Sequence, residues 1–207
     1  MLVEVITVLI SPLIRIAERL APSLYERIVG QAVKYGDSIT LTHVNTGHSL
    51  HSHGINYSHS GSSGQQQITA YSGSDSNDLW LVKAQDGLPA DYYTERPIRH
   101  GNIIRLEHIQ TKRNLHSHGG IPSPLTGQQE VSAYGDMGEG DFNDNWKVEV
   151  RGGGVWYEKK RVRLIHVDTG GALHSHAGHS HPQFTAGQQE VTCYKGRDDN
   201  DFWVVQT

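Results

Sequence analysis

The sequence predicts an all-β domain with pseudo-three-fold symmetry, and three observations support this prediction. A Leu-His-Ser-His motif occurs three times, at residues 50–53, 115–118 and 173–176. Each copy is followed by Gly-Gln-Gln and then by Asn-Asp-x-Trp, which ends at Trp80, Trp146 and Trp203. Equivalent positions lie 57 to 66 residues apart, enough for about four short strands with their turns. The three units must share one core, because each alone would leave an apolar face uncovered.

The composition fits one globular domain and excludes some functions. The chain has 207 residues, 36% of them apolar, with 23 glycines and a formal charge of −4. That charge provides no cationic stripe for a nucleic-acid backbone, so no nucleic-acid partner is expected. The single cysteine, Cys193, cannot form an intrachain disulfide and aligns with Ala70 and Ala133 of the other repeats. We therefore predict that Cys193 is a small buried residue rather than a nucleophile.

The first 34 residues lie outside the repeats and predict an amphipathic helix. Apolar residues recur at helical spacing from Leu13 to Ile28, with Pro12 near the start and Gly30 near the end. We expect residues 13–33 to pack on the domain, on a second copy of it or on another partner. An interfacial membrane helix and a degenerate signal core at residues 1–10 are alternatives. No stretch approaches the ~20 apolar residues of a membrane span.

Residues 35–207 form the predicted repeat domain, with repeats at about 35–90, 97–152 and 157–207. Near the start of each repeat, apolar and polar residues alternate as in a strand, for example at Ile39 and Leu41. A second alternating column precedes each Asn-Asp-x-Trp motif, for example at Ile68 and Ala70. Connections rich in Gly or Asn separate these strands. The loops after the Leu-His-Ser-His motifs vary most in length, and we expect any functional difference between the repeats to lie in these loops.

Nine of the 14 histidines fall into three columns of the repeat. One column is His43, His108 and His166, and the other two are the histidines of the Leu-His-Ser-His motif. Because side chains alternate along a strand, Leu50 and Ser52 share one face while His51 and His53 share the other. Leucine is expected to occupy the core. The histidine pair is then expected to face outward or into a groove beside a loop.

Two interpretations of the repeated polar residues remain open. In the first, the imidazoles and amides bond neighbouring loops and fix their shape, and the three tryptophans belong to the core. In the second, each repeat offers imidazole, hydroxyl and amide groups to a polar ligand such as a sugar. The candidate ligand-binding residues are His51, Ser52, His53, His116, Ser117, His118, His174, Ser175, His176, Gln66, Gln129 and Gln189.

The combination of Leu-His-Ser-His, Gly-Gln-Gln and Asn-Asp-x-Trp in three copies resembles the MIR family. This family is named after protein O-mannosyltransferases, inositol trisphosphate receptors and ryanodine receptors, and the resemblance covers residues 35–207. The chain is similar to the stand-alone stromal cell-derived factor two-like proteins, above all in its middle repeat. Its third repeat is similar to the MIR region of the O-mannosyltransferases.

The resemblance implies a β-trefoil with twelve strands, a six-stranded barrel and a hairpin cap. It also implies recognition without catalysis, because mannosyl transfer in that family belongs to the membrane-spanning part of the transferases. We therefore expect no catalytic residue, no cofactor and no dedicated metal site. The expected partner is a glycan or O-mannosylated protein, in quality control or glycosylation in the endoplasmic reticulum lumen, with a cytoplasmic location as the alternative.

Three other functions are open at this point. The domain and the N-terminal helix could instead form a scaffold that docks a J-domain chaperone or a transferase subunit without binding sugar. Inositol phosphate binding would need a basic cluster, and the candidates are Arg105, Lys112, Arg113, Lys159, Lys160, Arg161 and Arg163. A metal could bind the histidines at 174, 176, 179 and 181, since histidines two apart on a strand share a face.

Overall fold

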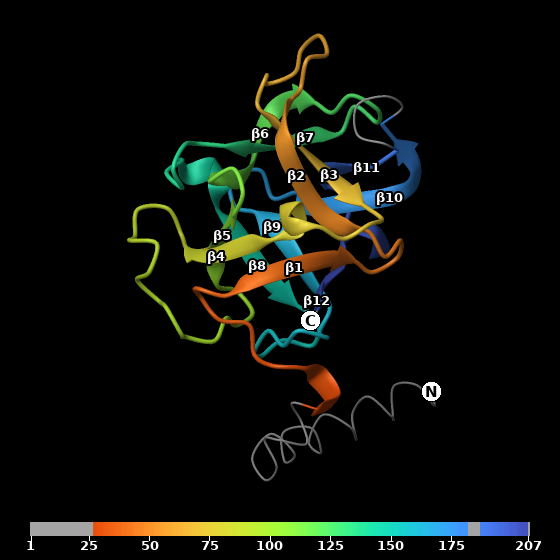
Figure 1. The fold of residues 1–207 in the computed structure, drawn as a ribbon. Helices are drawn as coiled ribbons and strands as arrows, with labels where there is room; N and C mark the ends of the chain where they lie inside the picture. The colour runs from red at the N-terminus through yellow and green to blue at the C-terminus, as the bar shows by residue number, and fades with distance from the viewer. Residues whose placement is uncertain (1–26, 182–186, 207) are drawn as a thin grey trace, which may run out of the picture.

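The computed structural model describes residues 27–181 and 187–206, and this part of the chain is all-β (Figure 1). Three one-turn 3-10 helices interrupt the strands: η1 (Ser76–Asp78), η2 (Phe142–Asp144) and η3 (Asp199–Asp201). The strands are β1 (Ser38–His43), β2 (Ser49–Asn56), β3 (Gln66–Tyr71), β4 (Trp80–Ala84), β5 (Ile103–His108), β6 (Arg113–Pro122), β7 (Gln129–Tyr134), β8 (Trp146–Val150), β9 (Val162–His166), β10 (Ala172–Ser180), β11 (Gln189–Tyr194) and β12 (Trp203–Gln206). Each repeat thus contains four strands, as the sequence predicts.

Six strands, two from each repeat, pair antiparallel into a closed ring. The ring runs β1–β4–β5–β8–β9–β12 and returns from β12 to β1. The remaining strands form the hairpins β2–β3, β6–β7 and β10–β11. Strands β3, β7 and β11 also pair with one another, so the three hairpins close a second layer over one end of the ring (Figure 1).

The core contains the apolar residues that recur in all three repeats. Trp80, Trp146 and Trp203 are fully buried, and each indole Nε1 donates a hydrogen bond of 2.9 Å to the backbone oxygen of the leucine that begins its motif. A buried indole needs such an acceptor, because an unpaired N–H in the core costs about 1–3 kcal/mol. The core interpretation of the three tryptophans is confirmed.

Side-chain hydrogen bonds link each repeat to the next, and the third repeat back to the first. Hydroxyl groups of the next repeat donate to the first glutamine of each Gly-Gln-Gln turn: Ser132 to Gln65, Thr192 to Gln128 and Thr69 to Gln188. Each repeat therefore depends on its neighbour for satisfied polar groups as well as for core packing. Cys193 lies inside this assembly with 2% of its surface exposed, and burial raises the pKa of its thiol to about 11. Its predicted role as a small buried residue is confirmed.

The segment before β1 already packs on the ring. Ala32 and Lys34 form isolated bridges with Tyr157 and Pro97, and Val33 is buried. Residues 27–29 are helical and Gly30 follows with a φ of +81°. The rest of the predicted helix, and the signal core considered at residues 1–10, lie outside the described residues. Among the described residues, no helix is long and apolar enough to cross a membrane.

Candidate functional site

The first histidine of each Leu-His-Ser-His motif, called here the inner histidine, is held by a buried aspartate. His51 Nδ1 lies 2.8 Å from Asp78 Oδ1, and His116 and His174 make the same contact with Asp144 and Asp201 at 2.9 and 2.8 Å. These aspartates end the 3-10 turns, where their second oxygen accepts the backbone N–H of the N-cap aspartate in a capping box. The Asn-Asp motif therefore orients the inner histidine.

The inner histidine is buried, so of the two predicted orientations, outward or into a groove beside a loop, the outward one is wrong. Only 2% of His51 is exposed, and the same holds for His116 and His174. Strand alternation correctly places the ring on the face opposite Leu50, but η1 of the same repeat packs on that face. Whether a strand face meets water depends on such a covering segment, which alternation cannot indicate.

Two further rings flank each inner histidine. The His51 ring centroid lies 5.0 Å from that of Tyr71 and 5.4 Å from that of His53. The tyrosines Tyr134 and Tyr194 and the second histidines His118 and His176 repeat this arrangement. We call His53, His118 and His176 the outer histidines. They are partly exposed, and burial lowers the pKa of His53, with the charge of His51 adding to the effect.

The serine of each motif faces the interior. Ser52, Ser117 and Ser175 are 1% exposed, and each hydroxyl donates to a backbone oxygen of the paired strand at 2.6–2.8 Å. Direct contact between these hydroxyls and a ligand does not fit this burial. The shared face of Leu50 and Ser52 already implied it.

The second glutamine of each Gly-Gln-Gln turn has a structural role in two repeats. Gln66 Nε2 donates to Ser52 Oγ and Thr111 Oγ1 at 2.7 and 2.9 Å, and Gln129 repeats both bonds with Ser117 and Thr169. Gln66 and Gln189 are buried, whereas Gln129 is partly exposed. Of the twelve candidate residues, the outer histidines and Gln129 thus remain accessible.

The third histidine column fixes the turns after β1, β5 and β9. His43, His108 and His166 are fully buried, and each Nδ1 lies 2.8–2.9 Å from a threonine hydroxyl three residues later. Each Nε2 contacts the backbone oxygen of the asparagine in an Asn-Asp motif. Burial lowers the pKa of His43 and His108 to about 4 and also lowers that of His166. The imidazoles of this column therefore fix the shape of these turns.

Two shallow grooves lie beside Tyr134 and Tyr194 and occupy equivalent positions in the repeat; Tyr134 is exposed and Tyr194 is partly exposed. One, of about 580 Å³, is lined by Tyr194 of the third repeat and by Gln128 and Gln129 of the second. The other, of about 470 Å³, is lined by Tyr134 and by Gly64 and Gln65 of the first repeat. Each groove thus combines a ring from one repeat with amide groups from the preceding one. The tyrosine column, which recurs at residues 71, 134 and 194, was the missed signal in the sequence.

The carboxylates beside the inner histidines are already engaged within the protein. His51, Asp75 and Asp78 bring their ligand atoms within 4.8 Å of one another, as do the equivalent groups in the other repeats. However, Asp75 Oδ1 accepts the Asn77 N–H at 2.7 Å, and both oxygens of Asp78 accept hydrogen bonds. A metal would have to break the capping box of each repeat. These groups are better explained as parts of the fold.

The four histidines of the 174–181 segment separate in the structure. His174 is buried against Asp201 and His181 is buried at the end of the hairpin, whereas the His176 and His179 rings lie 4.4 Å apart at the surface. Within residues 27–181 and 187–206, no group of three ligating side chains includes His176 or His179.

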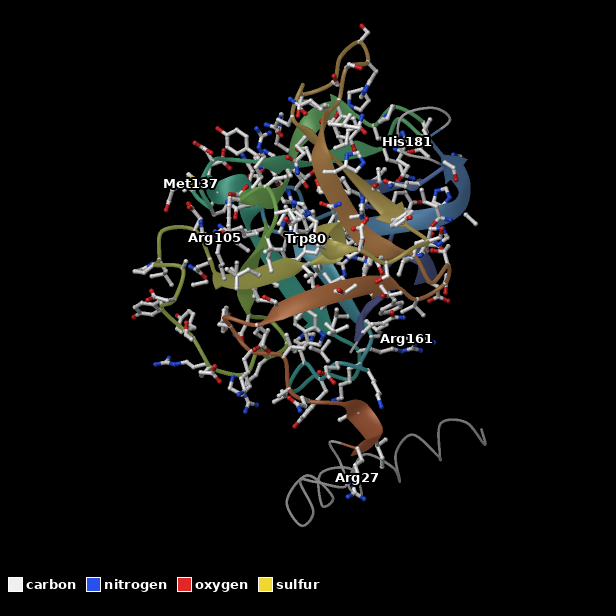
Figure 2. The ribbon with its side chains drawn as sticks, viewed as in Figure 1. Arg27, Trp80, Arg105, Met137, Arg161 and His181 are labelled. Carbon is white, nitrogen blue, oxygen red and sulfur yellow. The ribbon has the colours of Figure 1, made fainter. Side chains whose placement is uncertain are left out.

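The candidate basic residues are dispersed and partly compensated by acidic partners. Lys112 pairs with Glu107 at 3.1 Å, and Arg163 packs on Phe202 and contacts Asp201. Figure 2 shows Arg105 and Arg161 on different sides of the ring. These residues do not form a single phosphate-binding cluster.

The comparisons with known proteins identify the family. The family model described as "MIR domain" matches residues 55–205. The chain belongs to the MIR domain family. A "Stromal cell-derived factor 2-like protein" of Dictyostelium discoideum is 39% identical to this MIR protein, over 89% of this chain and 86% of its own length.

Solved structures agree with this membership. The crystal structure of the SDF2-like protein from Arabidopsis thaliana matches with a TM-score of 0.79 and 38% identity, covering 85% of this chain and 95% of that one. The S. cerevisiae protein O-mannosyltransferase Pmt1-Pmt2 complex bound to the sugar donor matches with a TM-score of 0.75 and 35% identity, over 85% of this chain. The match spans 25% of that transferase chain. A β-trefoil structure titled "BEL beta-trefoil" has a TM-score of 0.53 at 13% identity, covers 86% of this chain and 97% of its own, and bears on the fold alone.

Proposed function

We propose that residues 35–207 form one β-trefoil that recognises glycans, such as the mannosyl groups of O-mannosylated protein, without catalysing a reaction. The closed ring of six strands under three mutually paired hairpins supports the trefoil assignment. One observation carries the functional proposal: all three repeats present a tyrosine and an outer histidine on a buried histidine–aspartate support.

This arrangement suits a hydroxyl-rich ligand. A partly exposed tyrosine ring offers apolar surface to the C–H groups of a sugar, while imidazole and amide groups both donate and accept hydrogen bonds. The grooves beside Tyr134 and Tyr194 add the amides of Gln65 and Gln128. Because the grooves are shallow, we expect millimolar affinity at each site, with avidity for ligands that carry several sugars.

A non-catalytic role agrees with the fixed position of the polar groups. Each serine that could act as a nucleophile faces the core, on the opposite side of its strand from the histidine–aspartate pair. The geometry needed for proton transfer from serine to histidine is therefore missing in all three motifs. By similarity to the stromal cell-derived factor 2-like proteins and the transferases, we propose a role in glycosylation or protein quality control in the endoplasmic reticulum lumen.

A second candidate function is a protein-interaction scaffold, with a J-domain chaperone or a transferase subunit as the partner. The middle repeat favours it locally, because Met137 and Phe142 in one connection are 79% and 53% exposed. Exposed apolar side chains that are close in the sequence, as these are, often mark protein contacts. The glycan proposal, in contrast, draws on features of all three repeats.

A two-dimensional NMR titration of the full chain with mannose, mannobiose and an O-mannosylated peptide tests the first proposal. We expect saturable shifts at the amides near His53, His118 or His176 and near the three tyrosines. The triple variant His53→Ala, His118→Ala, His176→Ala should lose these shifts while its remaining spectrum stays dispersed. No shift at millimolar sugar would refute glycan recognition and favour the scaffold.

A further inference from the structure

A polar pocket lies on the outside of the ring and shares Glu139 with the groove beside Tyr134. It has a volume of about 350 Å³ and lies between residues 86–90, after β4, and residues 137–139, between β7 and β8. Lys83 of β4 and Arg105 of β5 also line it. Figure 2 shows Arg105 and Met137 on the same edge of the molecule.

The charges at the base of this pocket are buried and specific to one strand pair. Lys83, Arg105 and Glu107 are at most 6% exposed. In the register of β8 and β9, the positions of Lys83 and Arg105 correspond to Glu149 and Arg163, both partly exposed. Burying three charges costs free energy, so a cluster that the equivalent strand pair β8–β9 does not repeat indicates a local task at the junction of β4 and β5.

Two of the three buried charges satisfy each other. Glu107 Oε2 accepts from Lys83 Nζ at 2.9 Å, and its Oε1 lies 3.1 Å from Lys112 Nζ. Burial alone would raise the pKa of Glu107, but the bonds and charges of Lys83 and Lys112 outweigh it and hold the pKa below its usual range. Lys83 Nζ also donates to Gly138 O at 2.6 Å. These groups have little capacity left for a ligand.

Arg105, in contrast, has unused donors. Its Nε donates to Ala84 O at 2.9 Å, whereas Nη1 is 3.8 Å from Asp86 Oδ1, beyond hydrogen-bond distance. Within the described part of the chain, no hydrogen bond from either terminal nitrogen is found. The side chain is 4% exposed, so this guanidinium fork is fixed in place and borders the pocket.

The wall opposite residues 86–90 is a rigid feature of the middle repeat. The connection from Tyr134 to Asp141 is three residues longer than its counterparts in the other repeats. Gly138 anchors it: its oxygen accepts from Lys83 and from Asn114 Nδ2, and its N–H donates to Lys112 O at 2.7 Å. A Cβ at Gly138 would lie 2.4 Å from Glu107 Oε2, and φ there is +84°, so glycine is required.

We propose that this pocket binds a carboxylate carried on a short apolar body. The two terminal nitrogens of Arg105 would hold the carboxylate in a bidentate pair, the geometry that a guanidinium favours. Leu88, Pro89 and Met137 line the pocket beside it and supply apolar contact for the body. Three carboxylates line the same pocket, those of Asp86, Glu107 and Glu139. Glu107 is paired with Lys83 and Lys112, whereas Asp86, one-third exposed, and the exposed Glu139 repel a bound anion and limit the affinity.

NMR titration of the full chain with five compounds, namely one acid, three peptides and inorganic phosphate, tests the proposal. Glutarate represents a free acid, acetyl-Leu-Asp-Leu-amide an acidic side chain, and acetyl-Leu-Gly-Leu a free C terminus. The neutral acetyl-Leu-Asn-Leu-amide is the control. We expect saturable shifts of the Gly138 amide and the Met137 methyl with at least one carboxylate, and the strongest of the three identifies the source. Equal binding of the neutral peptide, tighter binding of inorganic phosphate, or no response would overturn the proposal.

Substitutions around the pocket separate Arg105 from other cations. Arg105→Gln should weaken carboxylate binding about tenfold or more, while Arg163→Gln, at the equivalent position of β9, should leave it unchanged. Asp86→Asn should tighten binding about threefold or more by removing one opposing charge. If Arg105→Gln does not fold, Met137→Glu at the exposed rim should weaken binding by repulsion. Unchanged affinity in the charge variants would refute the assignment.

Discussion

The inner and outer histidines occupy the same motif, two residues apart, yet the structure gives them different surroundings. His51, His116 and His174 are buried and bonded to aspartates, whereas His53, His118 and His176 are partly exposed, and no aspartate of the described residues lies within hydrogen-bond distance of them. The His118 Nδ1 lies 3.4 Å from the backbone oxygen of Gly119, and its ring packs edge-on against that of His116. The inner histidine therefore belongs to the scaffold, and the outer histidine is available for recognition.

This difference shows that repetition of a residue in all three repeats does not by itself indicate a role in binding. In a fold with pseudo-three-fold symmetry the same side chains pack in the same way in each repeat, so residues needed for packing recur just as binding residues do. Exposure and hydrogen-bond partners distinguish the two classes. Stability measurements and ligand binding should therefore separate the inner histidines from the outer histidines.

The largest expected effect is on the aspartate support of the inner histidine. Asp144→Ala removes the acceptor of His116 Nδ1, of the Asp141 N–H and of Asn114 Nδ2. Breaking such a buried polar network should lower the free energy of unfolding by about 3–5 kcal/mol. Urea unfolding followed by tryptophan fluorescence measures it. A loss below about 1 kcal/mol would show that the buried contact is not needed for stability.

Acid should destabilise the protein through the third histidine column. Since folding lowers the pKa of His43 and His108 to about 4, the unfolded chain binds more protons between about pH 6.5 and pH 4. Stability should be complete above pH 6.5 and fall through this window, by on the order of 2–3 kcal/mol per histidine.

Urea unfolding at pH 7.5 and pH 4.5 measures this loss. The variant His108→Gln should have a smaller pH dependence, because one buried imidazole no longer titrates. His118→Gln is the matched control, and its pH dependence should equal that of the parent protein. An identical slope in all three proteins would assign the acid sensitivity to other groups.

The sequence predicted most of the fold, because the fold depends on local, repeated signals. Alternation located the strands around Ile39 and Ile68, and the tryptophan column located the core. The limits of the predicted site have a physical origin. The 3-10 turn that covers His51 does not break strand alternation, so the covering of that face was not visible in the pattern. The inward hydroxyl of Ser52 was visible there, because Ser52 shares the face of the core residue Leu50.

The two features that sequence analysis missed depend on contacts between distant segments. The grooves join Tyr134 to the Gly-Gln-Gln turn of the preceding repeat, and the pocket at Arg105 joins two connections about 50 residues apart. No spacing rule in one repeat predicts either contact. The tyrosine column was nevertheless present in the alignment of the repeats and could have been selected as a candidate.

A smaller effect on stability is expected at the tyrosine that covers the inner histidine. Tyr134 is 38% exposed and its ring lies 4.8 Å from that of His116. Tyr134→Ala should lower the free energy of unfolding by about 1 kcal/mol, through loss of the ring contact. The same variant should abolish the sugar-induced shifts near the groove at Gln65. Tyr134→Phe should keep most of the stability, which shows whether ring packing or the hydroxyl contributes.

The smallest effect on stability is expected for the outer histidines themselves. His53→Ala, His118→Ala and His176→Ala should each change the free energy of unfolding by less than about 0.5 kcal/mol, as is usual for surface substitutions. Each ring makes an edge contact to the inner histidine, and the nearest backbone acceptors of His118 and His176 lie at 3.4 and 3.3 Å. Urea unfolding of the single variants, beside Asp144→Ala, measures the contrast. If an outer substitution destabilised the protein as much as Asp144→Ala does, both histidines of the motif would belong to the scaffold, and the recognition surface would have to lie elsewhere.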